Sequence, residues 1–230
     1  MKRLLYFICF TLFSLCQVIA QSGADGAVTR ASMYFTLNTN ILKDLQINSE
    51  LHNAGLPNFK QITIGTSLGL NFYVGTGFFN IEGGVASSLT KKQSGKASYF
   101  RYIPASLNYF IRVLGTTETP DIFVGVGYNF TAFNGDVFAK SSSIDLNNIS
   151  QNDLQGALNL NAISHGIAFS LLFSSESRKG WSDLSVMAGY ILDLSKPKWK
   201  SESANLSGSF SENFSRFTIA LIRPIKRWSR

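Results

Sequence analysis

The sequence predicts an all-β protein, an eight-stranded antiparallel up-and-down transmembrane β-barrel. Segments along most of the chain alternate apolar residues with small or polar ones, which is the period of a β-strand. The non-apolar positions hold Gly, Ser, Asn and Thr far more often than Lys or Glu, although a face in contact with water should be more charged. The links between segments are alternately long and short, which is typical of membrane barrels with an even number of strands.

Residues 60–75 illustrate the alternation. One parity is apolar except for a single Thr and reads Ile64, Thr66, Leu68, Leu70, Phe72, Val74. The other parity reads Thr63, Gly65, Ser67, Gly69, Asn71, Tyr73. The apolar parity would face lipid, and the small or polar parity would fill a narrow lumen. The same reading predicts strands at about 30–40, 60–75, 78–90, 98–113, 120–133, 160–174, 181–194 and 212–223.

The links divide into two classes by length. The long or polar ones are 41–59, 91–97, 134–159 and 195–211, and the short ones are 76–77, 114–119 and 175–180. In membrane barrels the long loops face the outside and the short turns face the periplasm. We therefore expect both termini in the periplasm and, with eight strands, a lumen packed with side chains rather than an open pore.

The first twenty residues read as a secretory signal peptide. Lys2 and Arg3 precede an apolar run that ends in small and aliphatic residues before Gln21. We expect residues 1–20 to be removed and residues 21–230 to form one outer-membrane barrel domain. Both cysteines, Cys9 and Cys16, lie in the leader, so the mature chain would have no disulfide and no thiolate metal site.

Composition and charge exclude several classes of protein. Only 15% of the residues are charged and 45% are hydrophobic, which excludes a disordered chain. One apolar run approaches the length of a membrane-spanning helix, and it is the leader, so a polytopic helical membrane protein is excluded as well. The formal charge of +7 does not indicate a nucleic-acid partner, because the chain is exported and no platform combining basic and aromatic residues is present.

One stretch resembles a known family. It runs through Tyr99–Phe110, which reads YFRYIPASLNYF, and continues in Asp121–Phe130, which reads DIFVGVGYNF. This hairpin and the Gly-x-Gly strand after it resemble the outer-membrane β-barrel domain family common in Bacteroidetes. The resemblance implies an outer-membrane barrel similar in architecture to the OmpA-like and OmpX-like small barrels. It carries over no catalytic residue.

Two charged residues lie on the inward parity, Glu82 and Arg216. Because a buried charge needs partners, we expect a polar network in the lumen. Its other candidate members are Tyr102, Asn108, Asn71 and Asn129. Such a network could stabilise the strand register, or it could line a gate or a narrow polar path.

Residues 44–54, followed by Gly55 and Pro57, read as a short helix in the first outer loop. The helix could act as a lid or bind a partner. The simpler interpretation is that it caps the barrel mouth with apolar side chains, namely Leu45, Ile47, Leu51 and Leu56.

The two histidines indicate no metal site and no cofactor. His52 and His165 have no metal-ligand spacing, and His165 has no carboxylate on its parity nearby. The sequence therefore predicts a non-enzymatic, integral outer-membrane barrel that contacts outer-membrane lipid. Its role would be structural, or would lie in binding a surface or periplasmic protein partner. The alternatives are a small gated or passive channel, a lipid A-modifying enzyme, and a soluble periplasmic ligand-binding barrel.

Overall fold

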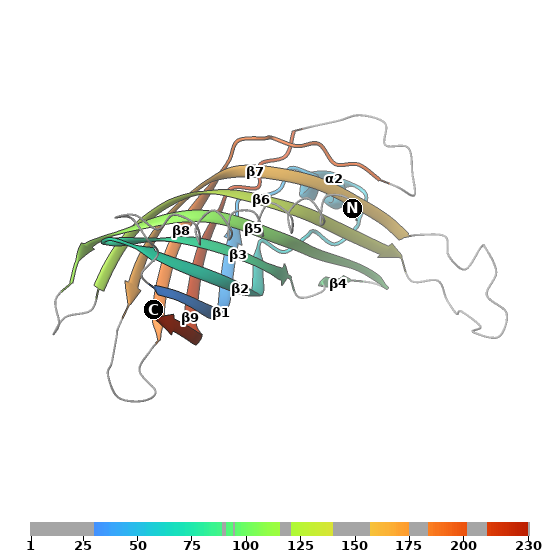
Figure 1. The fold of residues 1–230 in the computed structure, drawn as a ribbon. Coiled ribbons are helices and arrows are strands. Elements are labelled where there is room, and N and C mark those ends of the chain that lie inside the picture. The colour runs from blue at the N-terminus through green and yellow to red at the C-terminus, as the bar shows by residue number, and fades with distance from the viewer. Residues whose placement is uncertain are drawn as a thin grey trace.

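The computed structural model describes residues 30–88, 91–93, 95–115, 121–139, 157–174, 184–201 and 211–229. The predicted leader, 1–20, lies outside these ranges. Figure 1 shows long, curved strands arranged around a lumen. The strands of the described residues are β1 (Arg30–Leu42), β2 (Ile62–Val74), β3 (Gly77–Ser87), β4 (Lys91–Gln93), β5 (Lys96–Leu114), β6 (Asp121–Ala139), β7 (Ala157–Ser174), β8 (Ser185–Asp193) and β9 (Arg216–Ser229). The one helix among the described residues, α2 (Ile47–Asn53), has seven residues. In these ranges no helix is long and apolar enough to cross a membrane.

Eight long strands close into a ring. Each pairs antiparallel with its neighbours in the chain, apart from the three-residue β4, which only extends the edge of β5. The ring closes because β1 pairs with β9 and β3 pairs with β5. The predicted eight-stranded antiparallel up-and-down barrel is confirmed.

The barrel has two unlike ends. Arg30 of β1 is paired with both Ser229 of β9 and Tyr73 of β2, so the described chain enters and leaves the barrel beside the short β2–β3 turn. We call this the turn end. Helix α2 and the described residues that follow β8 and precede β9 lie at the opposite end, which we call the loop end (Figure 1).

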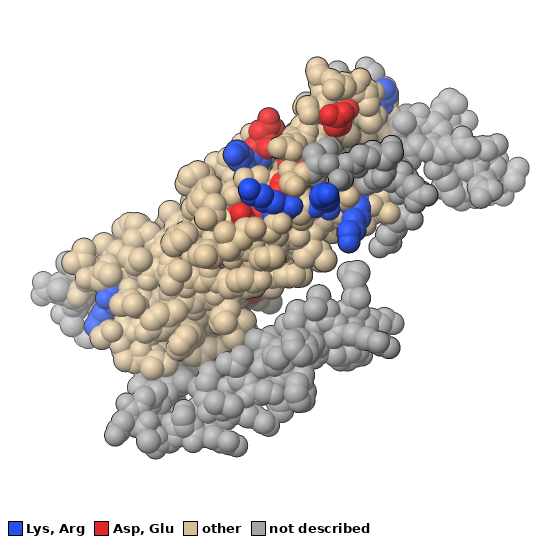
Figure 2. All heavy atoms as spheres, turned by 90° about the horizontal axis from the view of Figure 1, so that it is seen from above, with Lys and Arg blue, Asp and Glu red and all other residues tan. Residues whose placement is uncertain are grey.

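The apolar parity of the strands faces outward. The large apolar side chains at mid-strand are half exposed or nearly so, among them Leu68 (56%), Val126 (51%), Phe169 (52%) and Ile219 (56%). Figure 2 shows a broad stretch of the wall without charged side chains, beyond which Lys, Arg, Asp and Glu gather toward one end. A soluble barrel would turn this parity inward. So large an apolar surface is expected only where lipid or a partner covers it.

At the loop end the two faces exchange character. Phe100, Phe133, Val137 and Leu160 are apolar residues on the inward parity, and each is at most 2% exposed. The outward parity there becomes polar, as at Asp136. The strands therefore continue above the apolar band as a wall that packs on the loops.

This exchange explains why the predicted loop between the fifth and sixth strands was too long. Residues 134–159 were expected to form a loop, but β6 continues to Ala139 and β7 begins at Ala157. The last strand was expected over 212–223, but it runs over Arg216–Ser229. Residues 212–215 belong instead to the loop that covers the barrel mouth.

Candidate functional site

The lumen and its cover at the loop end contain most of the buried polar groups, so we take them as the candidate site. In the half of the lumen toward the turn end, Glu82 is the central charge. Its carboxylate accepts hydrogen bonds from the Tyr34 hydroxyl at 2.6 Å and from the Ser67 hydroxyl. Tyr34 and Ser67 come from β1 and β2, and Glu82 from β3, so three adjacent strands meet at one carboxylate.

Amide side chains extend this contact across the barrel. Asn108 of β5 donates to Asn80 of β3 at 3.0 Å, and Asn80 donates to Asn71 of β2 at 2.8 Å. Asn80 also donates to the Tyr34 hydroxyl. The predicted members Glu82, Asn71 and Asn108 thus lie in one network. The network joins β1, β2, β3 and β5, and therefore spans the β3–β5 pairing that closes the ring.

A second group of contacts surrounds Arg216, whose side chain is 2% exposed. One guanidinium nitrogen donates to Asn129 and to Thr131, each at 2.9 Å. The guanidinium carbon lies 5.1 Å from the centre of the Tyr102 ring and 5.6 Å from that of Phe133. These cation–π contacts partly offset the cost of burying the charge. The Nε atom has no hydrogen-bond partner among the described residues.

Glu82 and Arg216 do not pair. The structure places them, with Tyr102, Asn108 and Asn129, around a cavity of about 70 Å³ in mid-barrel. A larger cavity of about 220 Å³ occupies the turn end and is lined by Gly75 and Thr76 of the β2–β3 turn. Both cavities are lined by Glu82 and Met187. Glu82 and Met187 therefore lie between the two cavities, one at the turn end and one beside Arg216.

An aromatic cluster closes the loop end. Phe214 stacks on Phe133 with ring centres 3.8 Å apart, and Trp199 packs edge-on against Phe214 at 5.3 Å. Phe59 and Phe100 adjoin this cluster. Helix α2 and its flanks add further side chains to the same core, namely Leu42, Leu45, Ile47, Leu51 and, partly buried, Leu56. We call residues 43–60, 194–201 and 211–215 the cap. The simpler interpretation of the first outer loop, that its apolar side chains cap the mouth, is confirmed.

Two buried carboxylates stabilise the cap. One joins two segments of the cap, and the other joins the cap to the barrel wall. Glu212 is fully buried and accepts from the backbone N–H groups of Gln46 at 2.8 Å and Ile47 at 3.3 Å, and from the Trp199 indole at 3.0 Å. It therefore joins the start of α2 to the loop between β8 and β9.

The other buried carboxylate belongs to Asp193, at the end of β8. It accepts from Ser164 of β7 at 2.8 Å, from the Ser195 hydroxyl at 2.7 Å and from the Phe214 N–H at 2.9 Å. Asp193 thus holds the β8–β9 loop against the barrel wall. Nothing in a single sequence distinguishes these two carboxylates from the other acidic residues, so sequence reasoning does not find them.

Neither histidine ring is hydrogen-bonded to a hydroxyl group among the described residues. His165 faces outward, where its ring stacks on that of Tyr128 at 6.1 Å, whereas the neighbouring Ser164 faces inward to Asp193. Ser164 and His165 therefore cannot form a catalytic pair across the wall. His52 is exposed on α2. The described residues contain no cluster of His, Cys, Asp or Glu that could hold a metal ion.

The lumen packs aromatic rings against glycines. Tyr34 lies directly opposite Gly69 on β2, and a methyl group on Gly69 would overlap the Tyr34 ring. Close packing of this kind excludes extra side-chain atoms, whose insertion costs about 1–3 kcal/mol.

We therefore expect Gly69→Ala to lower the free energy of unfolding by about 1–3 kcal/mol, because Tyr34 must move away from Glu82. Gly83→Ala is the matched control, since a methyl group there would meet nothing within 4 Å. Urea titration of both variants in detergent micelles measures the difference. Equal stability of the two variants would contradict the packing described above.

Comparisons with known proteins add little. No family model matches the sequence, so the family suggested by the Tyr99–Phe130 resemblance stays a prediction. No curated protein matches either. Among solved structures the fold is similar to Neisserial surface protein A, with 12% identity and a TM-score of 0.46, over 84% of this chain and 97% of that one. So distant a likeness carries no conclusion about function.

Proposed function

We propose that this chain is an integral outer-membrane protein with a closed lumen, which acts at the cell surface through the cap and not as an open pore. The observation that carries the proposal is the pairing of a lipid-compatible wall with a sealed loop end. The apolar residues of the wall are exposed, and the rings of Trp199, Phe214 and Phe133 fill the mouth. A barrel in hydrocarbon must pair its backbone groups within the protein, and a ring of eight strands closed by the β1–β9 and β3–β5 ladders leaves no open sheet edge.

The cap supports a role at the surface. Glu212 and Asp193 hold it in one arrangement, so its exposed residues are presented on a rigid base. The length of the loops supports an orientation with the cap outside and the turn end in the periplasm. A surface partner of the cap would then meet a preformed site, which lowers the entropic cost of binding.

Two measurements test the proposal. The folded protein, extracted from membranes with detergent, is expected to change its electrophoretic mobility in SDS only after boiling. In planar bilayers it is expected to show no conductance steps. Recovery in the soluble fraction without detergent, or a steady open conductance, would contradict the proposal.

A gated channel is the second candidate. The two cavities that share Glu82 and Met187 favour it, because they lie one after the other along the lumen between the turn end and Arg216. In this case displacement of the cap would complete a path. Brief conductance steps that become more frequent when the cap is loosened would favour the channel over the closed barrel.

A further inference from the structure

Two exposed lysines, Lys43 and Lys60, flank the loop-end limit of the β1–β2 ladder, where the apolar band ends. The last residue pair of the β1–β2 ladder is Ile41 with Ile62, and both side chains are exposed. One step further, the Leu42 N–H donates to the Gln61 carbonyl at 3.0 Å. Continued by one more residue, this register places Lys43 opposite Lys60 on the outward parity, just beyond the ends of β1 and β2, and both residues are exposed. Like charges directly opposite each other on two chains of a ladder repel, and an anion between them would offset this repulsion.

The described residues supply no such anion. The nearest carboxylate in the sequence, Asp44, accepts instead from Gln61 at 3.1 Å and from Asn48. The two ion pairs among the described residues are Arg101 with Asp136 and Arg112 with Asp121. Neither involves Lys43 or Lys60.

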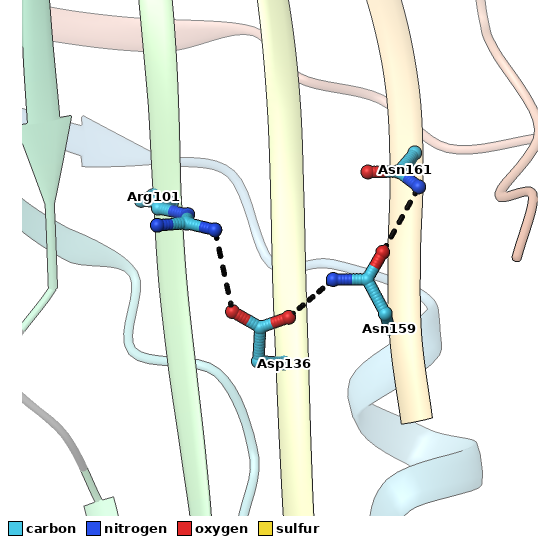
Figure 3. Close-up of polar contacts among 4 residues, drawn as sticks. All are labelled: Arg101, Asp136, Asn159 and Asn161. Atoms are coloured by element: carbon cyan, nitrogen blue, oxygen red, sulfur yellow. Dashed lines mark hydrogen bonds and ion pairs between the residues drawn. The ribbon is translucent and has the colours of Figure 1, made fainter. Parts of the chain in front are cut away.

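On the opposite side of the rim, on β5–β7, the outward charged and polar side chains pair with one another. Arg101 of β5 faces Asp136 of β6 at 3.9 Å, and Asp136 accepts from Asn159 of β7, which accepts in turn from Asn161 (Figure 3). These four residues lie on the outward parity and satisfy one another. The rim therefore has one self-contained polar side, on β5–β7, and one side with two cations that form no ion pair with a described residue, in the cap residues next to β1 and β2.

The position of the lysines indicates what would bind them. Below them the wall is apolar at Ile41, Ile62 and Ile64, which are 44–57% exposed. A ligand that fits both parts has acyl chains for the isoleucines and an anion at the depth of the headgroups. Two adjacent ammonium groups suit a phosphate, which offers several strong acceptor oxygens to their donors.

We infer that Lys43 and Lys60 form a binding site for a phosphorylated lipid of the outer leaflet, with its acyl chains along Ile41 and Ile62. The inference rests on the proposed function, because it needs the barrel in a membrane with the loop end outside. The lipid supplies the anion that the cross-strand lysine pair lacks, and the bound lipid in turn stabilises the junction between β1, β2 and the cap.

The test compares two double variants that each remove two positive charges from the loop end. Lys43→Gln with Lys60→Gln removes the site. Lys196→Gln with Lys200→Gln removes two other exposed lysines from the cap and is the matched control. Native mass spectrometry of the folded protein in micelles, titrated with lipid A and with dephosphorylated lipid A, measures lipid retention.

We expect the site variant to bind phosphorylated lipid A roughly 10- to 30-fold more weakly than the wild type, and the control to bind within about threefold of it. Dephosphorylated lipid A should bind all three proteins equally weakly, and millimolar inorganic phosphate should not displace the phosphorylated lipid. Equal losses in both double variants would overturn the site, as would displacement by inorganic phosphate, which would indicate a free-anion site.

Electrophoretic mobility separates this test from that of the proposed function. Both double variants should keep the shift on boiling that marks a folded membrane barrel. Absence of the shift in the wild-type protein would refute the membrane barrel itself. Retention of the shift with no loss of lipid in the site variant would refute only the lipid site.

Discussion

Leu68→Arg is expected to destabilise the folded barrel in a bilayer by about 2–4 kcal/mol. Leu68 lies in the middle of β2 on the outward parity, is 56% exposed, and is paired with Phe35 and Gly83 on the two neighbouring strands. A guanidinium at this depth has no polar partner on the wall and must be taken into hydrocarbon. The measurement is the urea dependence of folding into phosphatidylcholine vesicles, with the mobility shift on boiling as the signal.

Asn53→Arg is the matched control, because Asn53 is exposed on α2, outside the apolar band. An arginine there should change the free energy of folding by less than about 0.5 kcal/mol. The two substitutions add the same group at different depths. If Leu68→Arg were as harmless as Asn53→Arg, or made the protein soluble without detergent, the wall would face water and not lipid.

Glu212→Ala is expected to lower the free energy of unfolding by about 3–5 kcal/mol and to release the cap. The carboxylate is fully buried and accepts from the N–H groups of Gln46 and Ile47 and from the Trp199 indole. Removing it leaves two buried donors, the Ile47 N–H and the Trp199 indole, and the partly buried Gln46 N–H without an acceptor, and each buried donor costs about 1–3 kcal/mol. Hydrogen exchange at the Gln46 and Ile47 amides should accelerate much more than exchange in the β5–β6 ladder.

Two further variants make this result specific. Glu212→Gln keeps one acceptor oxygen and should give an intermediate loss of stability, whereas Glu50→Ala, on the exposed face of α2, should have little effect on stability.

Planar bilayer recordings of Glu212→Ala then separate the two proposed functions. Conductance steps in this variant alone would show that the cap closes a path. Silence, together with fast exchange at Gln46 and Ile47, would show that the lumen is blocked below the cap as well.

Most of the barrel could be predicted from local pattern. Alternation with period two assigns each residue of a strand to one of two faces, so Glu82, Asn71 and Asn108 could be placed in the lumen without knowledge of the neighbouring strands. The same pattern also contains an inversion of the two faces near the loop end of the strands. Phe100, Phe133, Val137 and Leu160 are apolar residues on the polar parity, and this inversion marks where hydrocarbon ends and the cap begins.

The contacts within the candidate site were less accessible to sequence reasoning. Glu82 and Arg216 were expected in one network, but in the structure each contacts a separate set of side chains. The Tyr34 hydroxyl binds Glu82, and Tyr102, Asn129 and Thr131 surround Arg216. Which of several inward side chains meet depends on the stagger of eight strands around the ring, and no single strand contains that information.

The sequence by itself determined the strands, their two faces and the division into long loops and short turns, because each of these follows from residues close together in the chain. Only the tertiary structure decided the cap, the separation of Glu82 from Arg216 and the juxtaposition of Lys43 with Lys60. Glu212 meets Gln46 across 166 positions of the chain, and the two come together only when β9 closes on β1. Contacts of this range follow from ring closure, which local alternation permits but does not specify.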